Sequence, residues 1–222
     1  MSAEGLLIKK QSKLVMIGDS ITDAGRKQPE GEGLFEALGR GYVSLIDALL
    51  GAVYPEQAIR VVNKGNSGNT VLDLKARWQQ DVLDLNPDWV SVMIGTNDVW
   101  RQFDSPLITE SHVPLDIYEY TLNDLVEQTA PHVKGIILMT PFYIEPNKDD
   151  AMRERMDEYG AAVKRISARH QTTFVDTQAA FDKVLETYYP ATLSWDRVHP
   201  SQTGHAILAR AFLNAIRYSW DG

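Results

Sequence analysis

Five short apolar runs, each followed by a longer stretch with helical spacing, constrain the fold of this chain more than any other feature. The runs cover residues 14–17, 59–62, 89–94, 135–139 and 172–175. Most are continuously apolar instead of alternating, which is typical of strands buried on both faces of a sheet. Helical spacing covers residues 41–53, 70–85, 115–129, 149–168, 178–187 and 201–218. This alternation predicts an α/β protein with a mostly parallel sheet and helices on both faces.

Composition limits the class of protein further. The 222 residues are 44% hydrophobic and include no cysteine, so we expect one domain over residues 1–222 without disulfides or thiolate metal sites. The net charge is −8 and no block of lysine and arginine occurs, which argues against nucleic acid as a partner. No stretch approaches the roughly 20 apolar residues of a membrane span. The first residues lack the roughly 7–15 apolar residues of a secretory signal, so we expect a cytoplasmic protein with no membrane partner.

The segments that follow the apolar runs carry the candidate chemistry. In open parallel sheets, ligands bind beyond the carboxyl ends of the strands. These segments, together with the one that precedes the last helix, cover residues 18–23, 63–69, 95–98, 140–143 and 195–200. They contain a hydroxyl, a glycine turn, an amide, a carboxylate and an imidazole. Acyl transfer needs this set of groups, so the sequence favours an acyl hydrolase with its site at this edge.

Each group has a role in that chemistry. A serine hydroxyl needs a base to remove its proton, and His199 is the best candidate base for Ser20. Asp196 lies three residues earlier, where a tight turn would place its carboxylate on one imidazole nitrogen. The tetrahedral intermediate needs hydrogen-bond donors, and the backbone N–H groups of Ser20 and Gly65 and the side-chain amide of Asn97 are the candidates.

Each residue also has a simpler interpretation when it is taken alone. Ser20 could cap a helix, Asn97 could sit in a turn, and Gly65 could provide positive φ. For Asp19 we favour a role in capping the loop backbone. For Arg26 we slightly favour a solvated loop charge over a contact with substrate.

Two other classes of protein remain open at this point. A phosphatase could use Asp19 or Asp23 with magnesium. A sugar-binding module without catalysis could use exposed aromatic rings such as Trp100, Trp195 and Tyr189. Neither alternative gives a role to the pair of Asp196 and His199. The G-x-S-x-G elbow, the H-E-x-x-H motif and the P-loop are all absent from the sequence.

Four spaced blocks resemble those of the SGNH, or GDSL-type, hydrolases. They cover residues 18–20, 63–68, 95–98 and 196–200. Ile21 departs from the leucine that the family name implies, but it keeps an apolar side chain of equal size. The resemblance implies a flavodoxin-like three-layer α/β/α sandwich with a five-stranded parallel sheet. It also implies Ser20 as nucleophile, His199 and Asp196 as base and acid, and no metal or organic cofactor.

A closer resemblance, to bacterial intracellular acetyl-xylan esterases, covers nearly the whole chain. It rests on residues 18–26, 61–65, 97–101 and 195–200. These enzymes remove acetyl groups from imported xylo-oligosaccharides, so the resemblance implies an acetylated sugar as the small-molecule substrate. A broad short-chain carboxylesterase or lysophospholipase, or transfer of the acyl group to an alcohol, stays open because the fold hosts many acyl substrates.

Aromatic and basic residues near these blocks give hypotheses about the substrate pocket. We expect Trp195 to limit the acyl pocket to acetyl size, although it could instead be a core tryptophan. Tyr189 is a candidate for stacking on the sugar ring. Arg101 could bind sugar hydroxyls or be a solvated charge. Four aromatic residues in expected loops are compatible with a homo-oligomer, namely Trp100, Phe103, Tyr143 and Trp220.

Overall fold

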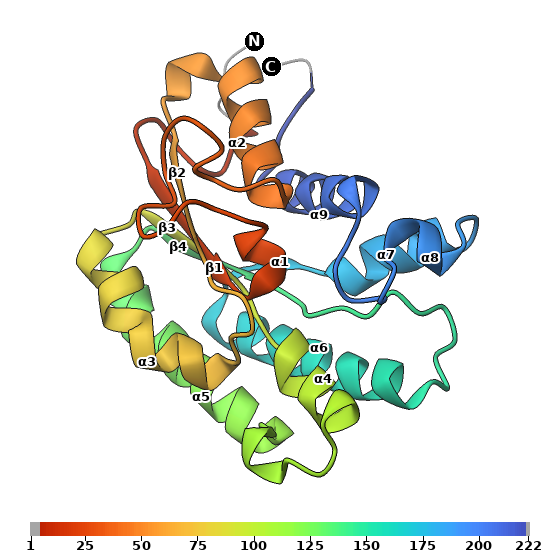
Figure 1. Cartoon of the computed structure of the whole chain (residues 1–222). Helices are drawn as coiled ribbons and strands as arrows, with labels where there is room; N and C mark the ends of the chain where they lie inside the picture. Colours follow the sequence, from red (N-terminus) through yellow and green to blue (C-terminus); the bar gives the residue numbers. More distant parts are fainter. Residues whose placement is uncertain (1–4, 221–222) are drawn as a thin grey trace.

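A five-stranded parallel sheet forms the centre of the computed structural model, which describes residues 5–220 (Figure 1). The strand order is β2-β1-β3-β4-β5, and every neighbouring pair is parallel. The strands are β1 (Lys13–Gly18), β2 (Arg60–Gly65), β3 (Trp89–Met93), β4 (Gly135–Met139) and β5 (Thr173–Val175). The predicted strands are therefore confirmed, with ends that shift by up to three residues.

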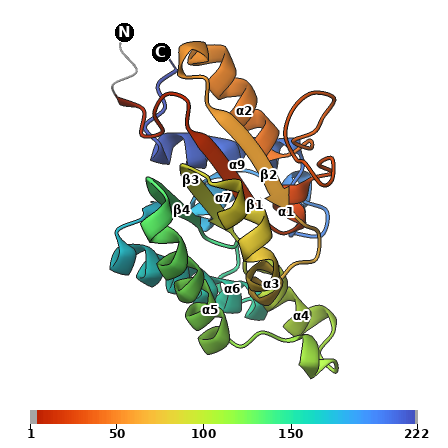
Figure 2. The same cartoon turned by 90° about the vertical axis from the view of Figure 1, so that its left-hand side faces the viewer.

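Helices cover both faces of the sheet, as Figures 1 and 2 show. The longer ones are α2 (Tyr42–Val53), α3 (Val71–Asp81), α5 (Leu115–Thr129), α6 (Ala151–His170), α7 (Thr177–Leu185) and α9 (Gln202–Ala215). Helices α2, α7 and α9 lie on one face, and α3, α5 and α6 lie on the other. The three-layer α/β/α sandwich is thus confirmed. None of the described helices is both long and apolar enough to cross a bilayer.

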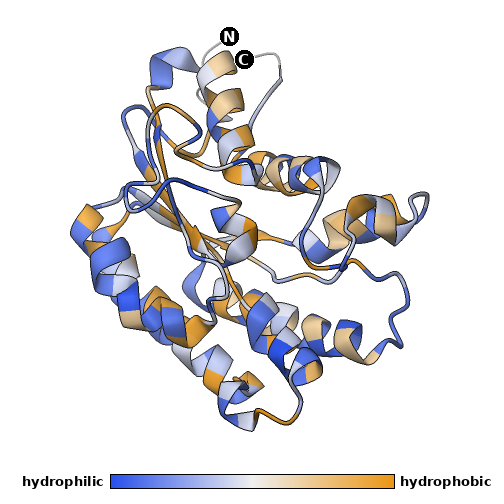
Figure 3. Ribbon diagram, in the orientation of Figure 1, coloured by the Kyte–Doolittle hydropathy of each residue, from blue (hydrophilic) through white to orange (hydrophobic). Residues whose placement is uncertain are grey.

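Alternate residues of the strands pack into two separate hydrophobic cores. In β4, Ile137 and Met139 join the core under α2 and α9, whereas Ile136 and Leu138 join the core under α3, α5 and α6. Figure 3 shows the resulting apolar centre of the molecule. Side chains on both faces of each strand are buried, and this explains why the strand sequences are continuously apolar.

Three short helices were missing from the sequence prediction. They are α1 (Ser20–Asp23), α4 (Thr96–Asp104) and α8 (Pro190–Leu193). No helix was expected between the predicted elements at 14–17 and 41–53, where α1 lies, or between those at 89–94 and 115–129, where α4 lies. Helix α4 has Gly95 as its N-cap, without a side-chain cap, so the sequence gives no start signal there.

The start of α3 shows the opposite situation. The Thr70 side chain accepts a hydrogen bond from the backbone N–H of Asp73, and Asp73 Oδ2 accepts one from the backbone N–H of Thr70. This capping box satisfies two of the free N–H groups at the start of the helix. A threonine followed three residues later by an aspartate is a local sequence signal for such a cap, and the cap marks where α3 leaves the loop after β2.

Candidate active site

The first segment of the site is the sharp turn that joins β1 to α1. A Cβ atom on Gly18 would lie 2.3 Å from Thr22 Oγ1 and 2.4 Å from the Met93 carbonyl oxygen, so only glycine fits there. Asp19 Oδ1 accepts a hydrogen bond from the Ile21 N–H at 2.9 Å, which confirms its expected capping role. Ser20 is the first residue of α1 and follows the carboxyl end of β1, an interior strand of the sheet.

Ser20, His199 and Asp196 form a continuous chain of hydrogen bonds. Ser20 Oγ lies 2.9 Å from His199 Nε2, although the two residues are 179 positions apart in the sequence. His199 Nδ1 lies 2.6 Å from Asp196 Oδ2. Both distances are within the range expected for a nucleophile, its base and the group that orients the base. The fold thus brings together the three side chains that the sequence singled out.

Asp196 is held as an ionised carboxylate. Its Oδ1 accepts from the backbone N–H groups of Val198 and His199 at 2.9 and 2.7 Å and from Ser194 Oγ at 3.0 Å. Burial alone would raise the Asp196 pKa, but the hydrogen bonds from His199 and Val198 outweigh burial and lower the pKa to about 2. An ionised carboxylate only accepts hydrogen bonds, so His199 Nδ1 carries the proton and Nε2 is free to accept one from Ser20.

The turn that carries the acid and the histidine is fastened to the segment that follows β4. Arg197 has a left-handed backbone with φ of 64°. Its carbonyl oxygen accepts from the Ile144 N–H at 2.9 Å, and its guanidinium forms an ion pair with Glu145. Through these two contacts, the backbone and the side chain of Arg197 are both attached to residues 144–145, which restrains the turn between Asp196 and His199.

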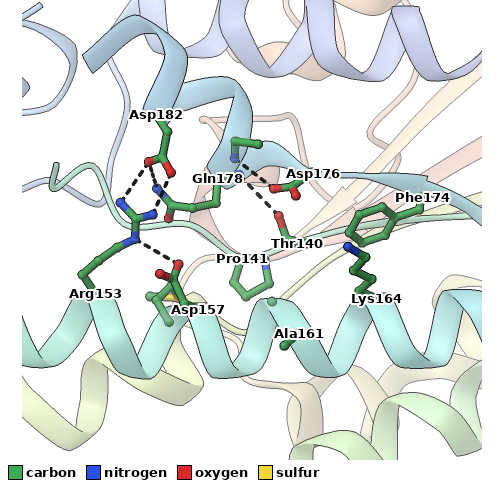
Figure 4. Close-up of a pocket in the computed structure, with 13 residues that line it drawn as sticks. Thr140, Pro141, Arg153, Asp157, Ala161, Lys164, Phe174, Asp176, Gln178 and Asp182 are labelled. Carbon is green, nitrogen blue, oxygen red and sulfur yellow. Dashed lines mark hydrogen bonds and ion pairs between the residues drawn. The ribbon is translucent and has the colours of Figure 1, made fainter. Parts of the chain in front are cut away.

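A small cavity of about 230 Å³ lies between α6 and α7, behind that segment (Figure 4). The fully buried Arg153 reaches from α6 to Asp182 on α7 with two bonds of 2.9 and 2.8 Å, and also donates to the Glu145 carbonyl oxygen at 2.6 Å. Gln178 binds both the N–H and the carbonyl oxygen of Tyr143 at 2.8 and 3.1 Å. Arg153, Gln178 and Asp182 pair with one another and with the backbone of residues 143–145, so these side chains support that segment. The cavity shares no lining residue with the triad.

Ser20 and Asn97, two of the candidate oxyanion donors, each have an N–H hydrogen without a partner within residues 5–220. The Ser20 N–H is the first N–H of α1 and has no hydrogen-bond partner within residues 5–220. Asn97 is buried, and its Nδ2 donates to the Asn69 carbonyl oxygen at 3.0 Å. That bond uses one amide hydrogen and orients the side chain, which leaves the second hydrogen available.

The expectation for Gly65 is wrong. Its N–H already donates to Asn63 Oδ1 at 2.8 Å, and its carbonyl oxygen accepts from Arg26 Nε at 2.5 Å. Its φ is not positive either, so the turn interpretation also fails. A Cβ atom there would lie 2.1 Å from the backbone nitrogen of Asp23. Gly65 is therefore needed for the close approach of α1 to β2 and does not supply a donor.

Gly68, three residues further along, is the residue that sequence reasoning missed. It has φ of +83° and lies exposed in the loop between β2 and α3. Its N–H has no hydrogen-bond partner in the described part of the chain. The sequence pattern that could have identified Gly68 lies in the same block. Gly68 follows Asn66 and Ser67, a combination typical of a turn in which glycine adopts positive φ without strain.

The interpretation of Arg26 as a solvated charge is also wrong. The residue is only 8% exposed, and its guanidinium donates to the backbone carbonyl oxygens of Gly65, Lys27 and Pro29. Burial lowers its pKa, although the nearby Asp23 carboxylate opposes that effect. All these acceptors belong to the loop after α1 or to the end of β2, so Arg26 stabilises loop structure.

The two acids considered for a phosphatase are occupied by local hydrogen bonds. Asp19 binds the Ile21 N–H, as described above. Asp23 accepts from Ser67 Oγ at 2.7 Å and from the Arg26 N–H at 3.1 Å. Within residues 5–220, no three histidine, aspartate or glutamate side chains gather as a metal site would require.

The aromatic residues near the triad differ in their positions. Trp195 is 93% exposed and Tyr189 is 72% exposed, so Trp195 is not a core tryptophan and has little protein around it to form an acyl pocket. Trp100 packs edge-on against His199, with ring centroids 5.7 Å apart. The Arg101 guanidinium lies 5.2 Å from the Trp100 ring and forms an ion pair with Asp104, so it is only partly free for a substrate.

Comparison with known proteins agrees with this geometry. The model of the GDSL-like lipase/acylhydrolase family matches residues 16–207. An acetylxylan esterase of Geobacillus stearothermophilus is 65% identical over 94% of this chain and 95% of its own length.

Two solved structures are similar over nearly the whole chain. The crystal structure of Axe2, an acetylxylan esterase of that organism, superposes with a TM-score of 0.96 at 64% identity, covering 97% of this chain and 98% of Axe2. LAE5, an alpha/beta hydrolase from the metagenome of Lake Arreo, has a TM-score of 0.93 at 57% identity, over 95% and 97% of the two chains. Catalytic mutants of Axe2 with a serine, an aspartate or a histidine replaced by alanine share the fold. With this match and the arrangement of Ser20, His199 and Asp196, the chain belongs to the GDSL-like lipase/acylhydrolase family and is a carboxylic ester hydrolase.

Proposed function

We propose that this protein is a serine esterase that removes acetyl groups from xylo-oligosaccharides through an acetyl-Ser20 intermediate. The observation that carries the proposal is the hydrogen-bonded chain from Ser20 Oγ through His199 to Asp196, with separations of 2.9 and 2.6 Å. The acetyl group and the xylan-derived sugar are supported by the similarity to acetylxylan esterases over nearly the whole chain. The catalytic mutants of Axe2 replace the same three residue types.

In the first step, Ser20 Oγ attacks the acetyl carbonyl carbon while His199 Nε2 accepts the hydroxyl proton. The carbonyl oxygen becomes an oxyanion, which accepts hydrogen bonds from the Ser20 N–H, the Asn97 amide and the Gly68 N–H. The bond between the carbonyl carbon and the sugar oxygen then breaks, and His199 gives its proton to that oxygen. The sugar leaves with a free hydroxyl, and the acetyl group stays on Ser20.

In the second step, a water molecule takes the place of the sugar hydroxyl. His199 accepts a proton from this water as its oxygen attacks the acetyl carbonyl carbon. The new tetrahedral intermediate collapses, the bond to Ser20 Oγ breaks, and His199 returns the proton to Oγ. Acetate leaves, and the ionised Asp196 stabilises the imidazolium in both steps.

Three residues near the triad are proposed to contact the sugar. Trp195 and Tyr189 present exposed rings close in sequence to the acid of the triad, and a sugar ring can stack on such a surface. Arg101 follows Trp100, which packs on His199, so its guanidinium lies near the sugar-leaving side of the site. The exposure of Trp195 favours a contact with the sugar over the acyl-limiting role first expected.

Assembly and location are part of the same proposal. Several large apolar side chains are at least 79% exposed in the single chain, namely Leu34, Phe35, Leu107 and Trp195. Surface of this kind supports a homo-oligomer, which sedimentation analysis would test. The location proposed for the protein is the cytoplasm, where imported xylo-oligosaccharides would be its substrate.

The test of the central proposal is the Ser20→Ala variant. We expect kcat on acetylated xylo-oligosaccharide to fall by about 10⁴-fold or more while the protein stays folded, because within residues 5–220 no hydroxyl other than that of Ser20 lies on His199. The wild-type protein should also gain the mass of one acetyl group on Ser20 when trapped during turnover. Ser44→Ala, which removes a hydroxyl bonded only to the Gly41 carbonyl oxygen, is the matched control and should keep full activity.

Two outcomes would count against the proposal. Substantial activity in folded Ser20→Ala protein would exclude Ser20 as the nucleophile. A series of ester substrates from acetyl to octanoyl tests the substrate class, because an acetyl esterase loses rate as the acyl chain lengthens. A preference for long chains would instead favour a lysophospholipase.

A further inference from the structure

Arg77, on the second turn of α3, lies directly behind the proposed oxyanion hole. Its guanidinium donates three hydrogen bonds to three different segments: to Asn69 Oδ1 at 2.7 Å, to the Lys64 carbonyl oxygen at 2.8 Å and to the Gly18 carbonyl oxygen at 3.1 Å. A fourth contact, to Asp81 Oδ2 at 2.8 Å, balances its charge. The side chain is only 16% exposed, so these contacts are sheltered from water.

Each of the three acceptors belongs to a segment that carries or orients one of the proposed oxyanion donors. The Gly18 carbonyl oxygen belongs to the last residue of β1, two residues before Ser20. The Lys64 carbonyl oxygen lies near the end of β2, where the loop that carries Gly68 begins. The third acceptor, Oδ1, is on the side chain of Asn69. The backbone carbonyl oxygen of the same residue accepts the hydrogen bond that orients the Asn97 amide, at 3.0 Å. One guanidinium therefore contacts the segments that lead to Ser20 and Gly68 and the residue whose carbonyl oxygen orients the Asn97 amide.

Only arginine can make this set of contacts. Its planar guanidinium carries five N–H donors in a fixed fork, so it can serve acceptors that lie in different directions at once. The ammonium group of a lysine is a single point on a flexible stem and cannot span the Asn69 side chain and two backbone carbonyl oxygens. The choice of arginine at this position thus fits a role in setting relative positions.

We propose that Arg77 is a positioning residue for the oxyanion hole, which sets the spacing between the donors of Ser20, Gly68 and Asn97. The inference rests on the proposed function, because it assigns no contact between Arg77 and the substrate. Oxyanion donors stabilise the transition state only when they lie about 2.7–3.1 Å from the position that the developing oxyanion takes. Loss of Arg77 therefore weakens transition-state binding more than substrate binding.

The test compares Arg77→Lys with the wild type at a temperature at which both are folded. We expect kcat to fall by about 10- to 100-fold with KM nearly unchanged. Phenylboronic acid, which forms a tetrahedral adduct with a catalytic serine, is the probe of the hole. Its inhibition constant should rise as kcat/KM falls. A role of Arg77 in stability alone would lower the melting temperature without moving this inhibition constant.

Arg165→Lys is the matched control, because Arg165 on α6 forms a two-bonded ion pair with Glu119 away from the site. It should leave both constants unchanged. If Arg77→Lys does not fold, Asn69→Ala decides, since it removes one acceptor of Arg77 while keeping the carbonyl oxygen that orients Asn97. We expect a smaller fall in kcat in that variant, with the same rise in the boronate constant.

The inference fails if folded Arg77→Lys, or Asn69→Ala in its place, keeps kcat and the boronate constant within about twofold of the wild type. The proposed function has a separate check, because Ser20→Ala must lose both activity and boronate binding. If Ser20→Ala keeps either, the proposed function is overturned and the inference with it. If only the Arg77 and Asn69 variants are unaffected, the inference alone is overturned.

Discussion

The carboxylate of Asp196 uses one oxygen for the turn and the other for the histidine. Oδ1 accepts three hydrogen bonds from the turn 194–199, and Oδ2 accepts only from His199 Nδ1. The ionised state of this carboxylate decides which nitrogen of the ring carries the proton. The activity of Ser20 thus depends on the charge of a residue that never touches the substrate.

The Asp196→Asn variant separates the charge of this residue from its shape. An amide can keep the Oδ1 contacts, but its NH₂ group then faces His199 Nδ1 and forces the proton onto Nε2. That tautomer cannot accept the proton of Ser20, so we expect kcat to fall by about 10⁴-fold with little change in the melting temperature. Asp150→Asn, at the N-cap of α6, is the control, because asparagine caps equally well. A decrease of less than tenfold in the Asp196 variant would contradict this role.

At this scale, side-chain chemistry was easier to predict than backbone chemistry. Ser20, Asp196 and His199 could be identified because their side chains are distinctive and their spacing is tight. Gly65 was chosen wrongly because any backbone N–H can be a donor, and whether it is free depends on a neighbour, here Asn63. Arg26 was misjudged because burial of a loop arginine depends on how the chain folds over it.

At the scale of secondary structure, the segment after β4 acts as a support for the catalytic turn. Glu145 is 8% exposed and its carboxylate forms the ion pair with Arg197, while its carbonyl oxygen accepts from the buried Arg153. Helices α6 and α7 thus contribute to the position of His199 without contributing a residue to the triad. No local sequence pattern indicates this support, because its members lie far apart along the chain.

The Glu145→Ala variant tests that support. The Arg197 guanidinium would lose its ion pair, while the hydrogen bond from the Ile144 N–H to the Arg197 carbonyl oxygen and the contacts of Asp196 Oδ1 would remain. Small displacements of a catalytic base are costly, so we expect kcat to fall by about tenfold while KM changes little. Glu36→Ala is the control, because it breaks an ion pair with Arg40 on an exposed surface. Equal kcat values for the two variants would show that the ion pair does not position the turn.

Element boundaries were predictable where a local signal marks them. The capping box at Thr70 marks the start of α3. Helix α4 begins instead at Gly95, with φ of +126° and no side-chain cap, so nothing in the local sequence marks its start. The contacts that stabilise α4 involve other elements, for example the hydrogen bond that Gln102 Nε2 donates to the Tyr159 hydroxyl on α6 at 3.0 Å. Such tertiary contacts are invisible in a single sequence.

At the scale of the whole molecule, buried ionisable groups make stability depend on pH in opposite directions. Burial raises the pKa of Asp98 to about 7 and that of Asp19 to about 6, with backbone hydrogen bonds opposing the shift in both cases. The folded state therefore holds these protons more tightly than the unfolded chain does. The stability that they contribute is complete below about pH 4 and is lost as the pH rises toward 7.

The pKa shift of His205 makes stability change with pH in the opposite direction. It joins α9 to α2, where its Nδ1 accepts the Tyr42 N–H at 3.2 Å and so caps a helix whose N-cap, Gly41, has no side chain. Burial, together with the charge of His199, lowers the His205 pKa to about 4. The unfolded chain therefore binds this proton more readily, and the stability is complete above about pH 6.5 and is lost as the pH falls toward 4.

The contribution of His205 can be isolated with His205→Gln, because Asp98 and Asp19 are common to both proteins and cancel in the difference. We expect the wild type to be more stable at about pH 7.5, with its advantage shrinking by about 2–3 kcal/mol by about pH 4.5. The loss follows because a protonated imidazole cannot accept the Tyr42 N–H and carries a charge into a buried site. Urea unfolding at several pH values measures both free energies. The exposed His132, replaced by glutamine as a control, should give a difference that changes little over this range. If the difference for His205→Gln is equally constant, protonation of His205 does not couple the packing of α2 and α9 to pH.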